Sequence, residues 1–445
     1  MGNRIIQISL ISLLLCLSII NLIPVFAPEI GFDALWYHLT LPKLWLTTGQ
    51  YYFPGRLLYY SAMPRLTETL FTPLLYFLGT TGPKLLQYLS GLATTFVIFS
   101  FLRKRQSFIV AVSGASFFYA THLVGWQGSS AYIDLFRTLL ETLAIVTYLS
   151  SYKNKLLLSA LFWSLSIGSK WNSIVSLTAF AFLFDLRLLP LGLLPALPWF
   201  MISFYFTGNP VFPLLSSEFT ASQFQAVGKN FFSPLIITTR FIRLPLSLLF
   251  PFDDWLSPAV ALLSLPTVFI SLVSRDKLIR RLGLYSFAMI LVWQLTPPPS
   301  TRYLLPVLPV IAIILSLYPW GRLRWFISSI LITSILVVLP IRAIAVSKFL
   351  PVVLGIVSDT QFLEDHKAKL PGTFVDTDGF VSGLPPSSTI LTDFHNLYYF
   401  DRPITHLDWA DVGTHYDYFI TASPSSSAGT LIHQSTWPAY VYQTP

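Results

Sequence analysis

The feature that most constrains this chain is a series of long apolar runs separated by short segments that carry Lys and Arg. Many of these runs reach about 18 to 20 residues, which is the length that an α-helix needs to cross about 30 Å of hydrocarbon. Charged residues make up only 11% of the chain and the mean hydropathy is +0.64, whereas soluble domains contain about 25% charged residues. We therefore predict an α-helical polytopic membrane protein.

The charge balance points to topology rather than to a nucleic-acid partner. The formal net charge is +8, but the basic residues fall in small clusters between the apolar runs, where membrane orientation accounts for them. We expect no nucleic acid as a partner. Cys16 is the single cysteine, so no disulfide and no cysteine-based metal site can form within the chain.

The first apolar run, 5–27, is longer than the core of a cleaved signal peptide and lacks an evident cleavage site. We interpret it as a retained membrane anchor. Basic clusters placed on the cytoplasmic side then order about eleven helices, with the N-terminus inside and the C-terminus outside. The predicted spans are about 5–27, 83–102, 107–126, 131–150, 156–169, 172–184, 188–206, 257–273, the run between 281 and 296, 304–318 and 325–345.

The distribution of charge supports this orientation. Thirteen of the 28 Lys and Arg residues fall in the short inner segments, whereas only Asp185 and Asp276 among the 20 acidic residues do. We expect an integral, multi-pass protein of a bacterial or archaeal cell membrane, surrounded by membrane lipids.

Two domains follow from the change in composition. Residues 1–349 form the transmembrane domain, with a long first outer loop at 28–82 that contains a short apolar piece, 66–78, predicted to be a juxtamembrane helix. Residues 350–445 are rich in Asp and lack helical apolar runs, so we predict a small outer α/β soluble domain. Its short apolar runs STILTDF (388–394) and YDYFITAS (416–423) read as strands.

The stretch GFDALWYHLTLPKLW (31–45) places a carboxylate just beyond the first span. In a helical segment Asp33 has Tyr37 at i+4, with His38 one position further round. A carboxylate, a phenol and an imidazole can thus meet at the outer surface. The alternative is that Asp33 only caps the following helix, a role that suits Asp.

Other charged residues gather on the same predicted side. Polar residues within membrane helices cost about 2.5 to 3.5 kcal/mol at mid-membrane and tend to line cavities. The outer set comprises Arg56, Arg65, Glu68, Lys84, Asp134, Arg137, Glu141, Lys170, Arg240, Arg243 and Arg302. Two simpler readings stay open, since the charges at 134, 137 and 141 share one helix face and can pair, and Arg302 and Lys170 can snorkel to lipid headgroups.

The order of motifs resembles the GT-C glycosyltransferases. The matching elements are the outer Asp with YHL and PKLW, then PRLTE (64–68), AYIDLFRTLLETLA (131–144), GSKWNS (168–173), PWFMISFYFTGNPVFPL (198–214) and RYLLPVLP (302–309). Within that superfamily the chain is most similar to family 39 and Rgt-type membrane transferases, relatives of the aminoarabinose and protein mannosyl transferases. The resemblance covers residues 5–345.

The resemblance implies transfer of a sugar from a polyprenyl-phosphate donor to a lipid, glycan or protein acceptor at the outer face of the membrane. The family's first outer loop supplies an acidic residue to the active site, and by position that is Asp33. Many relatives have two adjacent acidic residues, whereas Ala34 follows here. Because hard cations require several oxygen ligands, we favour no metal and expect no cofactor.

The chemistry then assigns roles to the candidate residues. Cleavage of a glycosyl phosphate bond develops positive charge on the sugar and negative charge on the phosphate. Asp33 is the candidate catalytic base that deprotonates the acceptor, and attack by the acceptor from the face opposite the phosphate predicts inversion. The candidate substrate-binding residues are Tyr37, His38, Arg56, Arg65, Glu68, Lys84, Asp134, Lys170, Arg302 and Tyr303. The alternative function is a secondary transporter or a flippase of lipid-linked sugars, which would concentrate its charges near the bilayer midplane.

Overall fold

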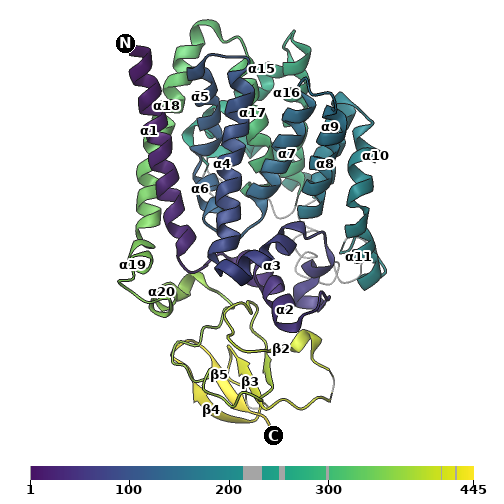
Figure 1. Cartoon of the computed structure of the whole chain (residues 1–445), viewed down its shortest axis with the longest axis vertical. Coiled ribbons are helices and arrows are strands. Elements are labelled where there is room, and N and C mark those ends of the chain that lie inside the picture. Colours follow the sequence, from purple (N-terminus) through teal and green to yellow (C-terminus); the bar gives the residue numbers. More distant parts are fainter. Residues whose placement is uncertain (1, 214–232, 250–255, 297–299, 412, 426–427) are drawn as a thin grey trace.

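The computed structural model describes residues 2–213, 233–249, 256–296, 300–411, 413–425 and 428–445. A bundle of roughly aligned helices forms the larger part, and a small domain with a β-sheet sits at one end (Figure 1). The N-terminus lies at the opposite end of the bundle from that domain.

The bundle is built from helices of unequal length. Its α-helices are α1 Gly2–Leu22, α4 Thr81–Arg103, α5 Phe108–Tyr119, α6 His122–Gly128, α7 Asp134–Tyr148, α8 Lys155–Ser169, α9 Ser173–Phe184, α10 Leu188–Leu193, α11 Leu197–Thr207, α14 Pro234–Leu249, α15 Pro258–Leu272, α16 Lys277–Leu295, α17 Leu308–Leu317 and α18 Arg324–Ser347. Short helical turns join several of them, namely η4 Leu194–Ala196, η5 Thr301–Val307 and η6 Gly321–Leu323.

The apolar helices confirm an integral membrane protein. Five described helices are long and apolar enough to span a bilayer, and the pair α5 and α6, bent by 66°, makes a sixth if it counts as one span. Each of the eleven predicted runs contains at least one helix, but several, such as α8 and α9, are short. The total of eleven spans and their orientation therefore stay predictions.

One helix lies where the sequence predicts an outer stretch without a span. Helix α14 occupies 234–249 and packs against α15 and α16. Apolar and polar residues, among them Arg240 and Arg243, alternate along this helix, as is typical of an amphipathic helix. Arg240 donates a hydrogen bond to the backbone oxygen of Gln294 (3.4 Å).

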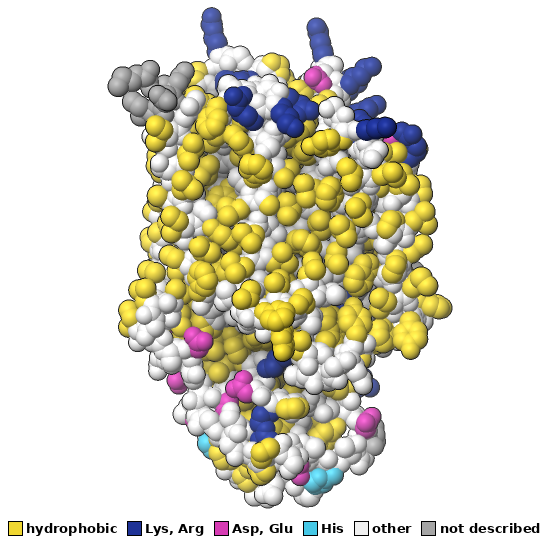
Figure 2. Space-filling view, viewed as in Figure 1, with side chains coloured by type: hydrophobic (Ala, Val, Ile, Leu, Met, Phe, Trp, Pro, Cys, Tyr) yellow, Lys and Arg dark blue, Asp and Glu magenta, His cyan; other side chains and the backbone are white. Residues whose placement is uncertain are grey.

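Charge is distributed unequally over the two ends. Figure 2 shows Lys and Arg gathered at the end away from the C-terminal domain, a broad hydrophobic band in the middle, and acidic side chains near that domain. The exposed basic side chains of the predicted inner segments are Arg103, Lys104, Arg105, Lys153, Arg187, Arg275, Lys277, Arg280, Arg281 and Arg322. The pattern is the one expected if this end faces the cytoplasm.

Small residues let the helices pack closely, as is usual within membranes. A Cβ at Gly283 of α16 would overlap Ser271 of α15, and one at Gly114 of α5 would overlap Ser316 of α17. Buried aliphatic and aromatic side chains surround these contacts together with several buried serines, and α17 is buried over nearly its whole length.

The first loop folds into short helices against the end of the bundle. They are η1 Ile23–Phe26, the π-helical turn η2 Ala34–His38, α2 Thr40–Thr48, η3 Arg56–Ala62 and α3 Leu66–Leu78. Helix α3 coincides with the predicted juxtamembrane helix 66–78. Gly49, at φ +66°, ends α2 in the left-handed conformation that glycine adopts easily.

The C-terminal domain is a small mixed sheet with short helices. It contains α19 Leu350–Val353, α20 Asp359–Asp365, η7 Lys367–Lys369, β1 Ile390–Thr392, β2 Thr405–His406, η8 Leu407–Trp409, β3 Tyr418–Thr421, β4 Thr430–Gln434 and β5 Tyr440–Gln443. The strand order is β2-β1-β3-β5-β4, with β1 parallel to β2 and β3, and β5 antiparallel to β3 and β4. The predicted strands at 388–394 and 416–423 are confirmed as β1 and β3.

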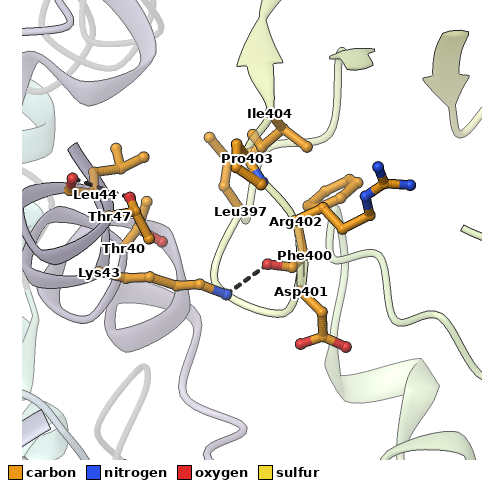
Figure 3. Close-up of a pocket in the computed structure, with 10 residues that line it drawn as sticks. All are labelled: Thr40, Lys43, Leu44, Thr47, Leu397, Phe400, Asp401, Arg402, Pro403 and Ile404. Carbon is orange, nitrogen blue, oxygen red and sulfur yellow. Dashed lines mark hydrogen bonds between the residues drawn. The ribbon is translucent and has the colours of Figure 1, made fainter. Parts of the chain in front are cut away.

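The C-terminal domain is fastened to the first loop. Its core, which includes Phe362 and Trp437, continues into Ala27 and Leu35 of the loop. Lys43 of α2 donates hydrogen bonds to the backbone oxygens of Tyr398 (2.6 Å) and Phe400 (2.5 Å), the latter drawn in Figure 3. The C-terminal domain and the first loop therefore share an interface. The first loop is packed against the helix bundle on one side and against the C-terminal domain on the other.

Candidate active site

Asp33 forms an ion pair with Arg302. The carboxylate Oδ2 lies 2.8 Å from the Nη1 atom of Arg302, which stands on η5, 269 residues further along the chain. The Asp33 side chain makes no capping hydrogen bond to η2, so the simpler reading of Asp33 as a helix cap is wrong. Both side chains keep some access to solvent, at 19% for Asp33 and 17% for Arg302, which a residue that meets a substrate requires.

Tyr132 holds the pair in place. Its hydroxyl oxygen accepts a hydrogen bond from the Asp33 backbone N–H (3.3 Å), and its ring lies 4.8 Å from the Arg302 guanidinium. The Nε–H of Arg302 donates to the Ser300 hydroxyl (3.1 Å). A cation stacked on an aromatic face and fixed by a second hydrogen bond has few alternative positions, so the guanidinium is preorganised.

A second ion pair extends the charged cluster. Lys170 Nζ lies 2.7 Å from Asp134 Oδ1 and 5.1 Å from the centre of the Tyr303 ring. The Asp134 carboxylate also lies within electrostatic range of Arg302. The site thus alternates two carboxylates and two cations, brought together from the first loop, α7, the end of α8 and η5.

Aromatic side chains surround Asp33 on the side of the C-terminal domain. Tyr37 stacks on Tyr60 at 4.1 Å between ring centres, and Trp36 meets Tyr60 edge-on at 5.0 Å. Burial raises the pKa of Tyr37 and of Tyr60, and the charge of Asp33 raises both further, so each hydroxyl keeps its proton. Flat rings with hydroxyl donors are well suited to the apolar faces and oxygen atoms of a sugar.

His395 of the C-terminal domain joins these aromatic side chains, and together with Tyr37 and Tyr60 it forms what we call the aromatic wall. Its ring lies 4.4 Å from that of Trp36 and 5.1 Å from that of Phe32, and its Nδ1 atom pairs with Asn396 Oδ1 at 3.0 Å. Burial lowers the pKa of His395, while Asn396 and Asp33 act in the opposite direction. Sequence reasoning missed this residue, because nothing near position 395 resembles a motif and only the folded domain brings it to the loop.

Two other predicted residues pair with each other instead of facing Asp33. His38 Nδ1 lies 2.6 Å from Glu68 Oε1 of α3, with both side chains buried within the first loop. Arg65 hydrogen-bonds to the hydroxyl of Tyr51, and its guanidinium lies 4.1 Å from that ring and 5.2 Å from the ring of Trp45. These contacts hold the loop together, and a substrate role for His38, Glu68 or Arg65 stays a prediction.

Lys84 and Arg56 lie apart from the charged cluster. The Lys84 ammonium is fully buried and donates hydrogen bonds to the backbone oxygens of Pro24 and Ala27, at the end of the first span. Arg56 is exposed at the start of η3, with a backbone φ of +34°. The structure shows neither side chain next to Arg302 or Asp134, and their proposed contacts with phosphate stay predictions.

The pairing alternative holds for part of α7. Arg137 Nε lies 2.7 Å from Glu141 Oε1, and both are buried, whereas Asp134 pairs with Lys170 on another helix. Among the residues that the structure describes, no group of three or more His, Cys, Asp or Glu side chains is placed to hold a metal ion. The metal-free mechanism remains a prediction.

The chain shares its overall fold with ArnT, as the resemblance in the order of motifs predicted. Among solved structures, the chain is similar to ArnT from Cupriavidus metallidurans bound to undecaprenyl phosphate, with a TM-score of 0.62 and 14% identity over 98% of this chain and 97% of that one. It is equally similar to the apo state of that ArnT, with a TM-score of 0.62 and 12% identity over 97% of each chain. No family model and no curated protein matches the sequence. The likeness to ArnT shows the fold alone.

Proposed function

We propose that the chain is a glycosyltransferase that moves a sugar from a polyprenyl-phosphate donor to a lipid, glycan or protein acceptor at the outer face of a bacterial or archaeal cell membrane. The observation that carries this proposal is the Asp33–Arg302 pair. It places a carboxylate and a phosphate-binding type of cation 2.8 Å apart, next to Phe32, whose ring contacts His395 of the C-terminal domain. The fold supports it, since ArnT, a protein of the same fold, has been solved with undecaprenyl phosphate.

The proposed reaction is a single displacement at the anomeric carbon. Asp33 accepts the proton of the acceptor hydroxyl or amine as that atom forms its bond to the anomeric carbon. On the opposite face the bond from that carbon to the phosphate oxygen breaks, and polyprenyl phosphate leaves with the electron pair. The anomeric configuration is inverted.

Arg302 and Lys170 stabilise the departing phosphate. Both cations already face a carboxylate, so the donor phosphate would enter as a competing anion in the cluster of Asp33, Arg302, Asp134 and Lys170. A guanidinium can then hold Asp33 with one nitrogen and the phosphate with another, since it offers five donors in a fixed plane. In this arrangement Arg302 contacts both the base and the leaving phosphate, through different nitrogen atoms, and so fixes the position of each relative to the sugar between them. The aromatic wall of Tyr37, Tyr60 and His395 is proposed to hold the sugar or the acceptor.

The test compares cells that lack the protein with cells complemented by wild type or by Asp33→Asn. Mass spectrometry of lipid-linked sugars and outer glycans should show a product that disappears in the deletion, returns with wild type and stays absent with Asp33→Asn. Asp411→Asn is the matched control, because Asp411 is exposed in the C-terminal domain. Normal product with Asp33→Asn at equal expression would overturn the role of Asp33. A deletion that changes only the distribution of a transported solute would favour the transporter alternative.

A further inference from the structure

A basic cavity lies beside the candidate active site. It has a volume of about 400 Å³ and lies between the ends of α6 and α18, the start of the first loop and the C-terminal domain. Its wall includes Arg342 of α18, Lys348 just after that helix, Lys369 of η7 and His122 of α6. Phe32 and Tyr132 also line it, and both adjoin the Asp33–Arg302 pair, since Phe32 precedes Asp33 and Tyr132 contacts both residues of the pair.

The basic side chains of this cavity lack a matching anion among the described residues. Arg342 is buried and donates from Nε to Asn21 Oδ1 (2.8 Å), but its Nη2 atom has no hydrogen-bond partner within the described part of the chain. Lys348 and Lys369 lie near each other, and burial, Lys369 and Arg342 lower the pKa of Lys348 to about 8. Three cations held together against their mutual repulsion indicate a place for a negative charge.

The one carboxylate among the residues described in the wall, Glu29, already accepts four hydrogen bonds. Glu29 Oε1 accepts hydrogen bonds from the backbone N–H groups of Ile30 (2.9 Å) and Gly31 (2.7 Å) and from the Ser130 hydroxyl (2.9 Å). Its Oε2 accepts from the backbone N–H of Ala131 (2.6 Å). With its oxygen atoms occupied in this way, Glu29 shapes the first loop and leaves the lysines available to another anion.

The position of the cavity relative to the membrane indicates which kind of anion it binds. Lys348 directly follows the apolar span Gly321–Ser347, so its ammonium lies where a helix leaves the hydrocarbon and meets lipid headgroups. A cavity of this size holds a headgroup as well as a phosphate. The residues Phe349, Trp126 and Ala345 add an apolar wall next to the cations.

We propose that this cavity binds the phosphate of an anionic lipid headgroup through Arg342, Lys348 and Lys369, at a site separate from Asp33 and Arg302. The site does not depend on the proposed transfer reaction. Because Tyr132 and Phe32 belong to both walls, a lipid seated here also braces the loop that carries Asp33.

The test measures binding by the full-length protein in phosphatidylcholine nanodiscs. The probes are dioctanoyl phosphatidic acid, dioctanoylglycerol, which has the same chains without the phosphate, and inorganic phosphate. Wild type should bind one equivalent of the phosphatidic acid with saturation, fail to bind the glycerol lipid, and bind inorganic phosphate far more weakly. The double variant Lys348→Gln/Lys369→Gln should weaken phosphatidic acid binding about tenfold or more.

Three controls keep the outcome decisive. Lys367→Gln removes the same charge two residues from Lys369 but outside the cavity wall, so it should leave binding unchanged. Lys348→Arg/Lys369→Arg should restore affinity, which a loss through misfolding would not allow. Asp33→Asn should bind the lipid normally. Equal affinity for inorganic phosphate, equal loss in Lys367→Gln, or no saturable binding by wild type would each overturn the proposal.

Discussion

Replacing Lys43 by Met should loosen the C-terminal domain without unfolding it. The Lys43 ammonium donates to the backbone oxygen of Phe400 (Figure 3) and to that of Tyr398, and it lies 5.3 Å from the Tyr398 ring. Met keeps the apolar stem and removes both hydrogen bonds. Burial lowers the pKa of Lys43, and the charge of Asp401 acts in the opposite direction. Part of the interaction energy of the ammonium therefore offsets the cost of its desolvation.

The magnitude follows from these two bonds. A hydrogen bond to a charged group contributes about 1.5 to 3 kcal/mol, so the pair contributes about 3 to 6 kcal/mol before desolvation is counted. We take about 2 to 3 kcal/mol as the net loss of docking free energy after the cost of burying a charge. The undocked population should then rise about 30- to 150-fold.

Hydrogen–deuterium exchange of the full-length protein measures that rise. Backbone amides in 394–404 should exchange about 30 to 150 times faster in Lys43→Met, while amides in β3 and β5 at the centre of the sheet stay protected. The control is Lys367→Met, which removes an exposed lysine of the same domain. Unchanged exchange in 394–404, or equal acceleration throughout the sheet, would refute the reasoning.

Three further predictions test the aromatic wall, the buried pair and the soluble domain. His395→Ala should lower transfer about tenfold through lost ring contacts, whereas His395→Phe should keep most of it; equal loss in both would point to the imidazole itself. Glu141→Leu should lower the free energy of unfolding by about 3 to 5 kcal/mol because Arg137 is left buried and unpaired, and Arg137→Met in the same chain should recover most of it in a denaturant titration. Asp378 accepts hydrogen bonds from His433 and Ser435, which outweigh its burial and lower its pKa to about 2. Its stabilising effect is therefore complete above the ordinary Asp pKa of about 3.9 and is lost as pH falls toward 2, so the difference in Tm between wild type and Asp378→Asn should shrink from pH 5 to pH 3; a constant difference would contradict it.

Helical structure could be predicted well because it depends on local composition. Every predicted span contains a helix, and the juxtamembrane piece 66–78 is α3. Boundaries were weaker where helices are short, as for α8 and α9, because apolar length no longer decides whether a helix crosses the membrane. Helix α14 was missed because its charged residues broke the apolar run.

Pairing between distant residues could not be predicted. The sequence indicated that Asp33 and Arg302 belong to one face, but a contact between atoms 269 residues apart depends on how the helices pack. The contacts of Lys84 also depend on the packing. Its predicted contact with phosphate stays a prediction, and the structure shows its ammonium donating to the backbone oxygens of Pro24 and Ala27, where the first span ends in a turn.

The depth of the charges along α7 bears on the choice between transfer and transport. Asp134 begins the helix and pairs with Lys170, which remains 17% exposed, whereas Glu141 lies seven residues further, about 10 Å deeper at 1.5 Å per residue. At that depth the Oε1 atom of Glu141 binds Arg137, Ser173 and Ser166, and the pair is fully buried. A transporter would need its deep charges open to a substrate. Here the partly exposed charges lie at the end next to the C-terminal domain and the deep pair is packed among serines, which favours chemistry at the membrane surface over passage through the bundle.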